Sequence, residues 1–172
     1  MEYEHIVHPF PPLYDENSRI LILGSLPSVK SREQMFFYGH PQNRFWPLIA
    51  RLLDEQEPRS IEEKKQLVLK HNIALWDTIY SCDIMGSGDS SIKNVVPTDL
   101  KPVVQRSKIE RVFCNGQTSW KYYHRFQEKE LGIEAAALPS TSPANAAWTI
   151  DRLAQAWKII LECDMRTEKQ RF

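Results

Sequence analysis

The sequence predicts an α/β fold: a single three-layer α/β/α domain with a central, mostly parallel, four-stranded sheet. Short apolar runs alternate along the chain with segments of helical periodicity, which is typical of a sheet covered by helices on both faces. The 172 residues, of which 42% are hydrophobic and 26% charged, suit one globular domain over residues 1–172. No segment is repeated or of low complexity.

Four apolar runs are the expected strands. The first, Arg19–Gly24, is short and continuously apolar, as expected for a strand buried on both faces of a parallel sheet. The other three are Ile73–Trp76, Glu110–Cys114 and Glu134–Leu138. Polar or glycine-bearing loops follow most of these strands. Because ligands of open α/β sheets bind at the carboxyl ends of the strands, we expect the function at that edge.

Helices are expected between and after the strands. Asn43–Asp54 carries apolar residues at helical spacing, and Ser60–Asn72 opens with a capping-box pattern. The remaining expected helices are Thr98–Gln105, Thr118–Leu131 and Pro143–Cys163. Outside the regular elements, residues 1–18 are expected to form an extended lead-in because of their prolines, and residues 164–172 a frayed tail.

Composition and charge leave the function open but restrict the environment. The 22 Lys+Arg residues balance 22 Asp+Glu, so no nucleic-acid partner is required, although a short DNA footprint needs only a local basic rim. Cys82, Cys114 and Cys163 are widely separated, the first residues are charged, and no apolar run is long enough to span a bilayer. We therefore expect a cytoplasmic protein without a membrane segment or a disulfide framework.

Three other kinds of site find little support. The run Gly24–Ser31 follows a strand and nearly matches the phosphate-loop pattern GxxxxGK[ST]. However, Val29 stands where the motif needs glycine, and Pro27 lacks a backbone N–H. The five histidines have no metal-ligand spacing, and no GxSxG elbow is present. A nucleotide hydrolase is thus a minor alternative, and we expect neither a metal nor a cofactor.

The segment Met35–Trp46 is dense in aromatic residues. Phe45 and Trp46 are expected to pack into the core from the helix that follows. Tyr38 precedes this helix and is free to form a wall on which a planar ligand stacks.

Two motifs resemble those of the uracil-DNA glycosylase superfamily. The first joins Gly24-Ser25-Leu26-Pro27 to Tyr38-Gly39-His40-Pro41-Gln42-Asn43-Arg44-Phe45-Trp46, and the second is Pro139-Ser140-Thr141-Ser142-Pro143-Ala144-Asn145. The similarity spans about Ile20 to Leu161. The most similar branch is that of the hypoxanthine (deoxyinosine) DNA glycosylases, which share the GSLP opening and the LPSTSPAN close.

Three departures from other branches of the superfamily matter for the chemistry. Ser25-Leu26-Pro27 contains no Asp or Asn to position water, Ser28 replaces the usual glycine, and Leu138 replaces a histidine that polarises uracil. The deoxyinosine branch uses instead the asparagine of its HPxN segment, which matches Asn43. The resemblance therefore implies that Asn43 is catalytic and holds either the water or the departing base. The alternative is a helix N-cap.

The resemblance and the loop positions imply further site residues. For contact with the base we expect Gly24, Ser25, Tyr38, Asp77 and Asn115. A helix cap or structural role is the alternative for Asp77 and a turn for Asn115. For contact with DNA we expect Pro27, Ser28, Lys30, Ser140, Ser142 and Asn145, since hydroxyl groups at a helix start suit phosphate oxygens. The alternative for the last three is simple capping of the last helix.

The sequence thus predicts a monofunctional, metal-independent DNA glycosylase. Its partner is DNA that contains deaminated bases, with hypoxanthine first and uracil or xanthine next, and we expect a monomer. A local basic rim is expected from Lys30, Arg32, Arg44 and Lys93. The competing class is a nucleic-acid-binding α/β protein without catalysis, which the missing carboxylate of the first motif leaves open.

Overall fold

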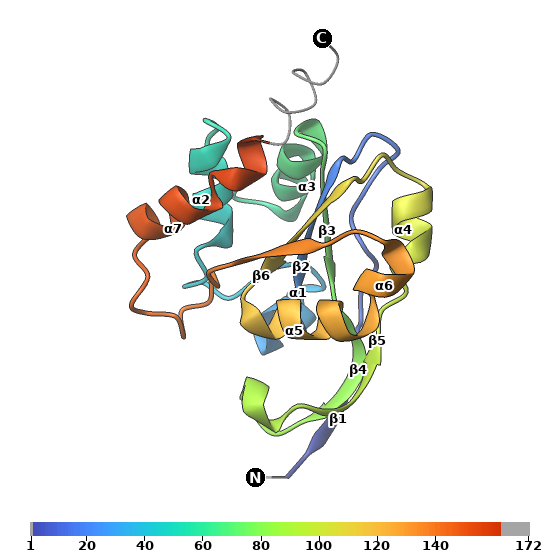
Figure 1. Cartoon of the computed structure of the whole chain (residues 1–172). Coiled ribbons are helices and arrows are strands. Elements are labelled where there is room, and N and C mark those ends of the chain that lie inside the picture. Colours follow the sequence, from blue (N-terminus) through green and yellow to red (C-terminus); the bar gives the residue numbers. More distant parts are fainter. Residues whose placement is uncertain (1, 163–172) are drawn as a thin grey trace.

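The computed structural model describes residues 2–162 and contains the expected parallel sheet (Figure 1). Its strands are β2 (Ile20–Gly24), β3 (Ile73–Asp77), β6 (Arg111–Asn115) and β7 (Ala135–Leu138), in the order β3-β2-β6-β7. All three pairings are parallel. The four predicted strands are therefore confirmed. β2 and β3 are fully buried, which accounts for their continuous apolar runs.

The strand register brings three predicted site residues to one edge. Gly24 lies opposite Asp77, and Leu23 lies opposite Cys114, so that Asn115 ends the neighbouring strand at the same level. The loops after β2, β3, β6 and β7 consequently meet at the carboxyl edge of the sheet.

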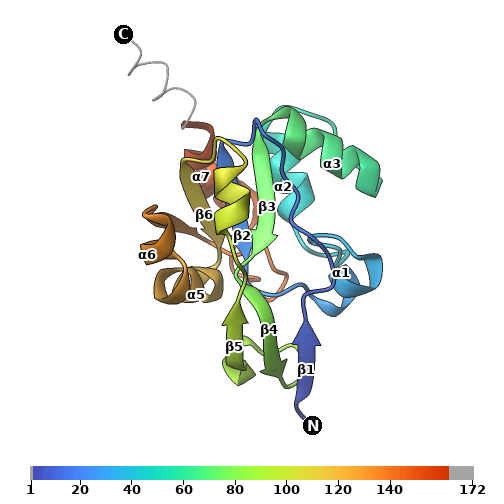
Figure 2. The same ribbon diagram turned by 90° about the vertical axis from the view of Figure 1, so that its right-hand side faces the viewer.

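Helices cover both faces of this sheet, as the two views show (Figures 1 and 2). On one side lie α2 (Phe45–Leu52) and α7 (Ile150–Trp157), and on the other α4 (Lys101–Gln105) and α5 (Gln117–Phe126). Two more helices are α3 (Ile61–Lys70) and α6 (Glu128–Leu131). The core fills the space between these layers, with Leu21, Phe45, Phe113 and Trp157 among its fully buried side chains.

The start of one predicted helix agrees with the sequence, and the start of another differs. Ser60 forms the predicted capping box with Glu63 at the start of α3. The last helix starts later than expected, at Ile150 behind the N-cap Thr149, because the residues after Pro143 form turns. Its predicted end at Cys163 and the predicted tail 164–172 lie outside the described residues. A short helix that was not predicted, α1 (Val29–Gln34), follows the first loop.

A second sheet was not predicted at all. It consists of β1 (Glu4–Val7), β4 (Ile79–Ile84) and β5 (Lys93–Pro97), in the antiparallel order β1-β4-β5. Figures 1 and 2 show it extending from one end of the main sheet. The lead-in is extended, as expected, but part of it pairs as β1. The 3₁₀ turn η1 (Asp89–Ser91) connects β4 to β5.

The described residues also hold two free, buried cysteines, Cys82 and Cys114. Within residues 2–162, no helix combines the length and the apolar character needed to cross a membrane. In the same part of the chain, no three His, Cys, Asp or Glu side chains gather as a metal site would require.

Candidate active site

A cavity of about 430 Å³ opens at the carboxyl edge of the parallel sheet. All six residues predicted for catalysis and base contact line it: Gly24, Ser25, Tyr38, Asn43, Asp77 and Asn115. Four of the six predicted DNA contacts line it as well: Pro27, Ser28, Ser140 and Ser142. Its size lies within the range of small-molecule sites.

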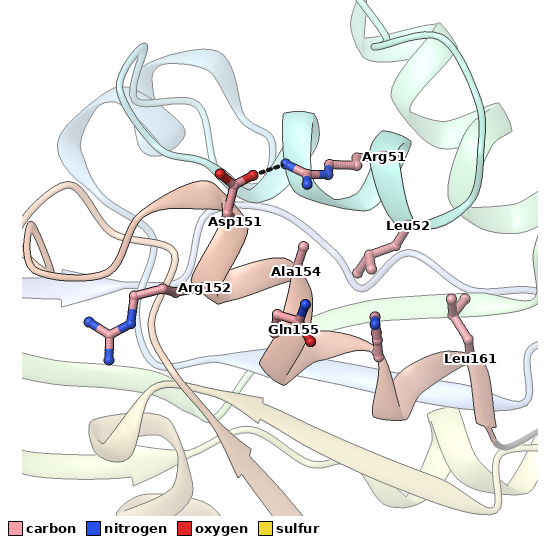
Figure 3. A pocket seen from close by; sticks show the side chains of 8 residues that line it. Arg51, Leu52, Asp151, Arg152, Ala154, Gln155 and Leu161 are labelled. Atoms are coloured by element: carbon pink, nitrogen blue, oxygen red, sulfur yellow. Dashed lines mark hydrogen bonds and ion pairs between the residues drawn. The ribbon is translucent and has the colours of Figure 1, made fainter.

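A larger hollow, of about 600 Å³, lies elsewhere, between α2 and α7 (Figure 3). An ion pair of 2.7 Å between Arg51 and Asp151 crosses it, and both side chains are at least half exposed. None of the predicted site residues lines this hollow. Since the polar groups of the motifs converge on the smaller cavity, we take that cavity as the candidate active site.

Asn43 belongs to a chain of hydrogen bonds that joins two loops and the end of β6. Its Oδ1 accepts from the Thr141 hydroxyl at 2.9 Å, and the same hydroxyl accepts from Asn115 Nδ2 at 3.0 Å. Asn115 Oδ1 in turn accepts from the backbone N–H of Thr141 at 3.0 Å. Thr141, the central member, is 1% exposed, so its hydroxyl is shielded from water. The end of β6 and the loop after β7 thereby fix the position of Asn43.

The same Asn43 oxygen also accepts a hydrogen bond at the start of a helix. It accepts from the backbone N–H of Phe45, the first residue of α2, at 2.9 Å. The N-cap of α2 is Arg44, which makes no side-chain cap, so Asn43 is not the N-cap of the alternative and lies one residue before it, in the cavity wall. Because Oδ1 accepts two hydrogen bonds, the amide orientation is fixed. No described residue pairs with Nδ2, which leaves a hydrogen-bond donor at the cavity.

Tyr38 stands in the cavity wall in a strained backbone conformation, with φ at 54°. Its ring stacks on Phe45, with centroids 4.0 Å apart and an angle of 26° between the planes. Its hydroxyl is buried and has no hydrogen-bond partner among the described residues. Burial, and secondarily the nearby Asp77, raises the pKa of Tyr38 above its ordinary value, so the phenol stays neutral.

Asp77 ends β3 beside Gly24. A Cβ added to Gly24 would lie 2.4 Å from Asp77 Oδ1, so glycine is needed for this approach. The other carboxylate oxygen, Oδ2, is 2.7 Å from Nε2 of His8, which follows β1. Asp77 is 4% exposed and His8 7% exposed. The segment that follows β1 of the second sheet thus places His8 against the Asp77 carboxylate.

Arg44 holds the loop after β7 in place. Its guanidinium donates to the backbone carbonyl oxygens of Ser142 at 2.8 Å, Asn145 at 3.1 Å, Thr141 at 3.3 Å and also Trp148. Arg44 thus has a structural role, and its contribution to a basic rim stays a prediction. A guanidinium forms such a clamp because its five N–H donors point in fixed directions.

The other three residues of the expected basic rim lie in different surroundings. Arg32 lines the cavity, whereas the exposed Lys30 lies 3.4 Å from Glu33 and outside the lining. Lys93 lies over the ring of Tyr3 on the second sheet, 3.8 Å from its centroid. The structure does not gather these cations into one rim.

The two serine-rich loops are held by their own hydroxyl groups. Ser28 is the N-cap of α1 and accepts from the backbone N–H of Ser31 at 3.2 Å. Ser140 accepts from the N–H of Ser142 at 3.1 Å, and Asn145 donates to the carbonyl of Ser140 at 3.0 Å. Since α7 begins only at Ile150, these residues do not cap the last helix, and that alternative is wrong.

Sequence reasoning missed two residues of the site, Thr141 and His8. Thr141 was part of the second motif, but its contacts lie 26 and 98 positions away in sequence and leave no local pattern. The five histidines have no metal-ligand spacing, so the sequence does not single out His8. The one available signal was its place in a proline-rich segment, which excluded a helix but could not reveal the distant Asp77.

An α/β domain with a polar cavity at the carboxyl edge of a parallel sheet belongs to the large class of ligand-binding α/β proteins. A match to a known family narrows this class further. The model of the uracil DNA glycosylase superfamily matches residues 11–162, and the chain belongs to this superfamily.

Relatives agree with this assignment. A hypoxanthine DNA glycosylase of Methanosarcina acetivorans is 36% identical over 153 residues, which cover 88% of this chain and 95% of the relative. One of Methanosarcina barkeri is 38% identical over 141 residues, covering 79% and 86%. A solution NMR structure from M. acetivorans, described provisionally as a uracil DNA glycosylase, superposes with a TM-score of 0.76 at 32% identity, covering 88% and 93%.

Proposed function

We propose that this protein is a monofunctional DNA glycosylase that hydrolyses the N-glycosidic bond of deaminated bases in DNA. Hypoxanthine is the first substrate, and uracil or xanthine are further ones. The observation that carries the proposal is the cavity at the sheet edge, where both superfamily motifs converge on Asn43. The curated names of the relatives support hypoxanthine as the base.

The reaction sets two electrostatic tasks once the base has left the stack. Water adds to C1′ of the sugar, and the base departs with the bonding electron pair and takes up a proton. The transition state is positive at C1′ and negative on the base. An enzyme must therefore hold the water and donate hydrogen bonds to the departing base. Extruding a base costs a few kcal/mol, and less for a poorly paired deaminated base.

Asn43 suits the second task. Two donors already occupy its oxygen, so the group that it offers to the cavity is the Nδ2 donor. We infer that this donor stabilises the charge that develops on the base or orients the attacking water by donation. Thr141 and Asn115 are positioning residues that act through Asn43. Tyr38, with its ring backed by Phe45, offers a rigid wall for stacking.

The flanking loops supply the contacts with DNA. Ser25, Pro27 and Ser28 border the cavity on one side, and Ser140 and Ser142 on the other. We propose that they meet the phosphate backbone, with Lys30 and Asn145 further from the cavity. No lysine lines the cavity within the described residues, which supports hydrolysis without a Schiff base. One chain contains the whole cavity, which suits a monomer, and we propose action in the cytoplasm.

The proposal is tested with labelled duplexes that contain inosine, uracil, xanthine or adenine at one position. Incubation followed by alkali cleavage should reveal strand breaks at inosine first, with equal yield in the presence of EDTA. Binding without any product would favour the non-catalytic alternative, and turnover of nucleoside triphosphates with Mg²⁺ would favour a nucleotide hydrolase.

Two substitutions at Asn43 separate its roles. Asn43→Ala should lower excision about 100- to 1,000-fold, as expected for loss of one aligned donor. Asn43→Asp retains the oxygen that accepts from the Phe45 N–H and from Thr141, but it lacks the donor. It should therefore keep the melting temperature closer to that of the wild type and still lose excision. Full activity of the Asp variant would show that Asn43 does not act as a donor.

A further inference from the structure

The buried contact between His8 and Asp77 is not explained by packing alone. The Nε2 and Oδ2 atoms lie 2.7 Å apart, and the side chains are 0% and 6% exposed. The two residues come from different sheets and are 69 positions apart in sequence. Because burial of polar groups is costly without a functional or structural return, the pair is a candidate for a role at the adjacent cavity.

The imidazole of His8 is held rigidly. Its ring lies 4.3 Å from that of Trp76 and 4.6 Å from that of Phe10, measured between centroids. Its backbone N–H donates to the carbonyl of Tyr80 at 2.7 Å, which ties it to β4. The ring therefore presents Nε2 to Asp77 in one orientation.

The surroundings of Nδ1, the second ring nitrogen of His8, indicate which of the two nitrogens carries the ring proton. His8 Nδ1 is buried without a hydrogen-bond partner among the described residues. An imidazolium, or the neutral form with its proton on Nδ1, would leave a buried N–H unpaired there. The neutral form with its proton on Nε2 leaves only an unpaired acceptor, which is the more tolerable state. In that form His8 donates to a carboxylate.

The free oxygen of Asp77 is then fixed as an acceptor at the cavity. Asp77 lines the cavity, and no described residue donates a hydrogen bond to Oδ1, which lies beside Gly24. We propose that His8 is a positioning residue that orients the Asp77 carboxylate, and that Asp77 Oδ1, as an acceptor, discriminates hypoxanthine, which has a ring N–H, from adenine, which lacks one at the same place. This inference rests on the proposed function and adds a basis for that one discrimination.

The chemistry of the bases fits this acceptor. Hypoxanthine carries a hydrogen on N1, and uracil and xanthine carry ring N–H groups beside carbonyls. Adenine has a lone pair at N1, which would face the carboxylate without a proton between them. A site that hydrogen-bonds an N–H rejects analogues without it, because its own buried group is left unpaired.

The decisive variant is Asp77→Asn. If His8 donates through Nε2, the amide oxygen of the variant turns to His8 and its NH₂ group turns to the cavity. A donor then replaces the acceptor. Single-turnover excision of hypoxanthine should fall about 100-fold or more, and the preference for hypoxanthine over adenine should narrow. An unchanged preference in an active variant would overturn the proposal.

A second substitution in that background tests the role of His8. Adding His8→Ala removes the donor that orients the amide, so the amide can rotate and offer its oxygen to the base. Excision of hypoxanthine should recover about tenfold relative to Asp77→Asn alone. A merely structural role would predict a further loss, and that result would overturn the proposal. The control is His5→Ala combined with Asp77→Asn. His5 forms an exposed pair with Asp83 at 2.8 Å, so its removal should not restore excision of hypoxanthine.

A measurement on the unmodified protein does not depend on folding of the variants. In ¹⁵N spectra of the imidazole side chains at neutral pH, His8 should show a protonated Nε2 and a bare Nδ1. An imidazolium, or a proton on Nδ1 alone, would overturn the proposal. Failure of the wild-type protein to excise any base would refute the proposed function instead, and this outcome is separate from the selectivity of an active enzyme.

Discussion

Gly24 shows how strongly a single residue can depend on its neighbour across a strand pair. Directly opposite Asp77 in the register, it leaves no room for even a methyl group beside Oδ1. The superfamily motif begins with this glycine, and the structure gives a steric reason for it: any side chain here would push the carboxylate out of place.

Gly24→Ala should therefore reduce excision about 100-fold, because displacement of a group by about 1 Å in an active site has effects of that size. The measurement is kcat/KM on an inosine duplex. Gly88→Ala is the matched control, since the nearest atom to its added Cβ is the Met85 oxygen at 3.9 Å. Wild-type activity of Gly24→Ala would mean that Asp77 can move without consequence.

At this scale, the sequence predicted the cavity residues that follow strands or belong to a motif. Gly24, Asp77 and Asn115 follow from the rule that parallel strands end at one edge. The partners of these residues could not be predicted in the same way. The contacts of His8 and Thr141 depend on tertiary packing between segments that are far apart in the chain.

At the scale of elements, the start of α2 and the loop before α7 form one unit through Arg44. Its guanidinium meets four backbone carbonyl oxygens of the loop, and its backbone N–H donates to the Thr141 carbonyl at 3.1 Å. The loop has no regular hydrogen-bond ladder, so its shape depends on this side chain.

Arg44→Lys should cost about 1–3 kcal/mol of unfolding free energy, because an ammonium group cannot reach all these acceptors and some stay unpaired. Amide hydrogen exchange should accelerate in residues 141–148. Arg51→Lys, in the same helix, is the control. Its exposed pair with Asp151 should contribute only about 0–1 kcal/mol. Equal stability of the two variants would refute the role of Arg44 as a clamp.

The two sheets differ in how far the sequence predicts them. The central strands β2 and β3 of the parallel sheet contain continuous apolar runs, since they are buried on both faces. The two outer strands of the second sheet are largely exposed: β1 buries only Ile6, and β5 has no fully buried residue. Such strands lack a strong pattern and are fixed by pairing over long distances in sequence, with bulges between β4 and β5.

At the scale of the whole molecule, stability should depend on alkaline pH through buried acids. Burial raises the pKa of Cys114 to about 12, and it raises the pKa values of Tyr38 and Tyr123 above their ordinary range. The unfolded chain loses these protons at about 8.5 for Cys and about 10 for Tyr. Their contribution is thus complete below those values and is lost as the pH rises toward the folded-state pKa values.

The unfolding free energy, measured by urea titration, should therefore fall progressively above about pH 9. Tyr38→Phe should make this fall less steep above about pH 10, because one titrating group is removed. Tyr80→Phe, at a side chain that is 48% exposed, is the control. A stability that is constant up to pH 11 would contradict the expectation.

The hydrogen bonds through Thr141 have a consequence for when the cavity can form during synthesis of the chain. Asn43 and Asp77 emerge early from a ribosome, whereas the threonine that connects Asn43 to Asn115 follows 98 residues after Asn43. A growing polypeptide cannot assemble the pocket until that late segment has been translated and clamped. A chain that ends before residue 141 therefore lacks the contact that links Asn43 to Asn115.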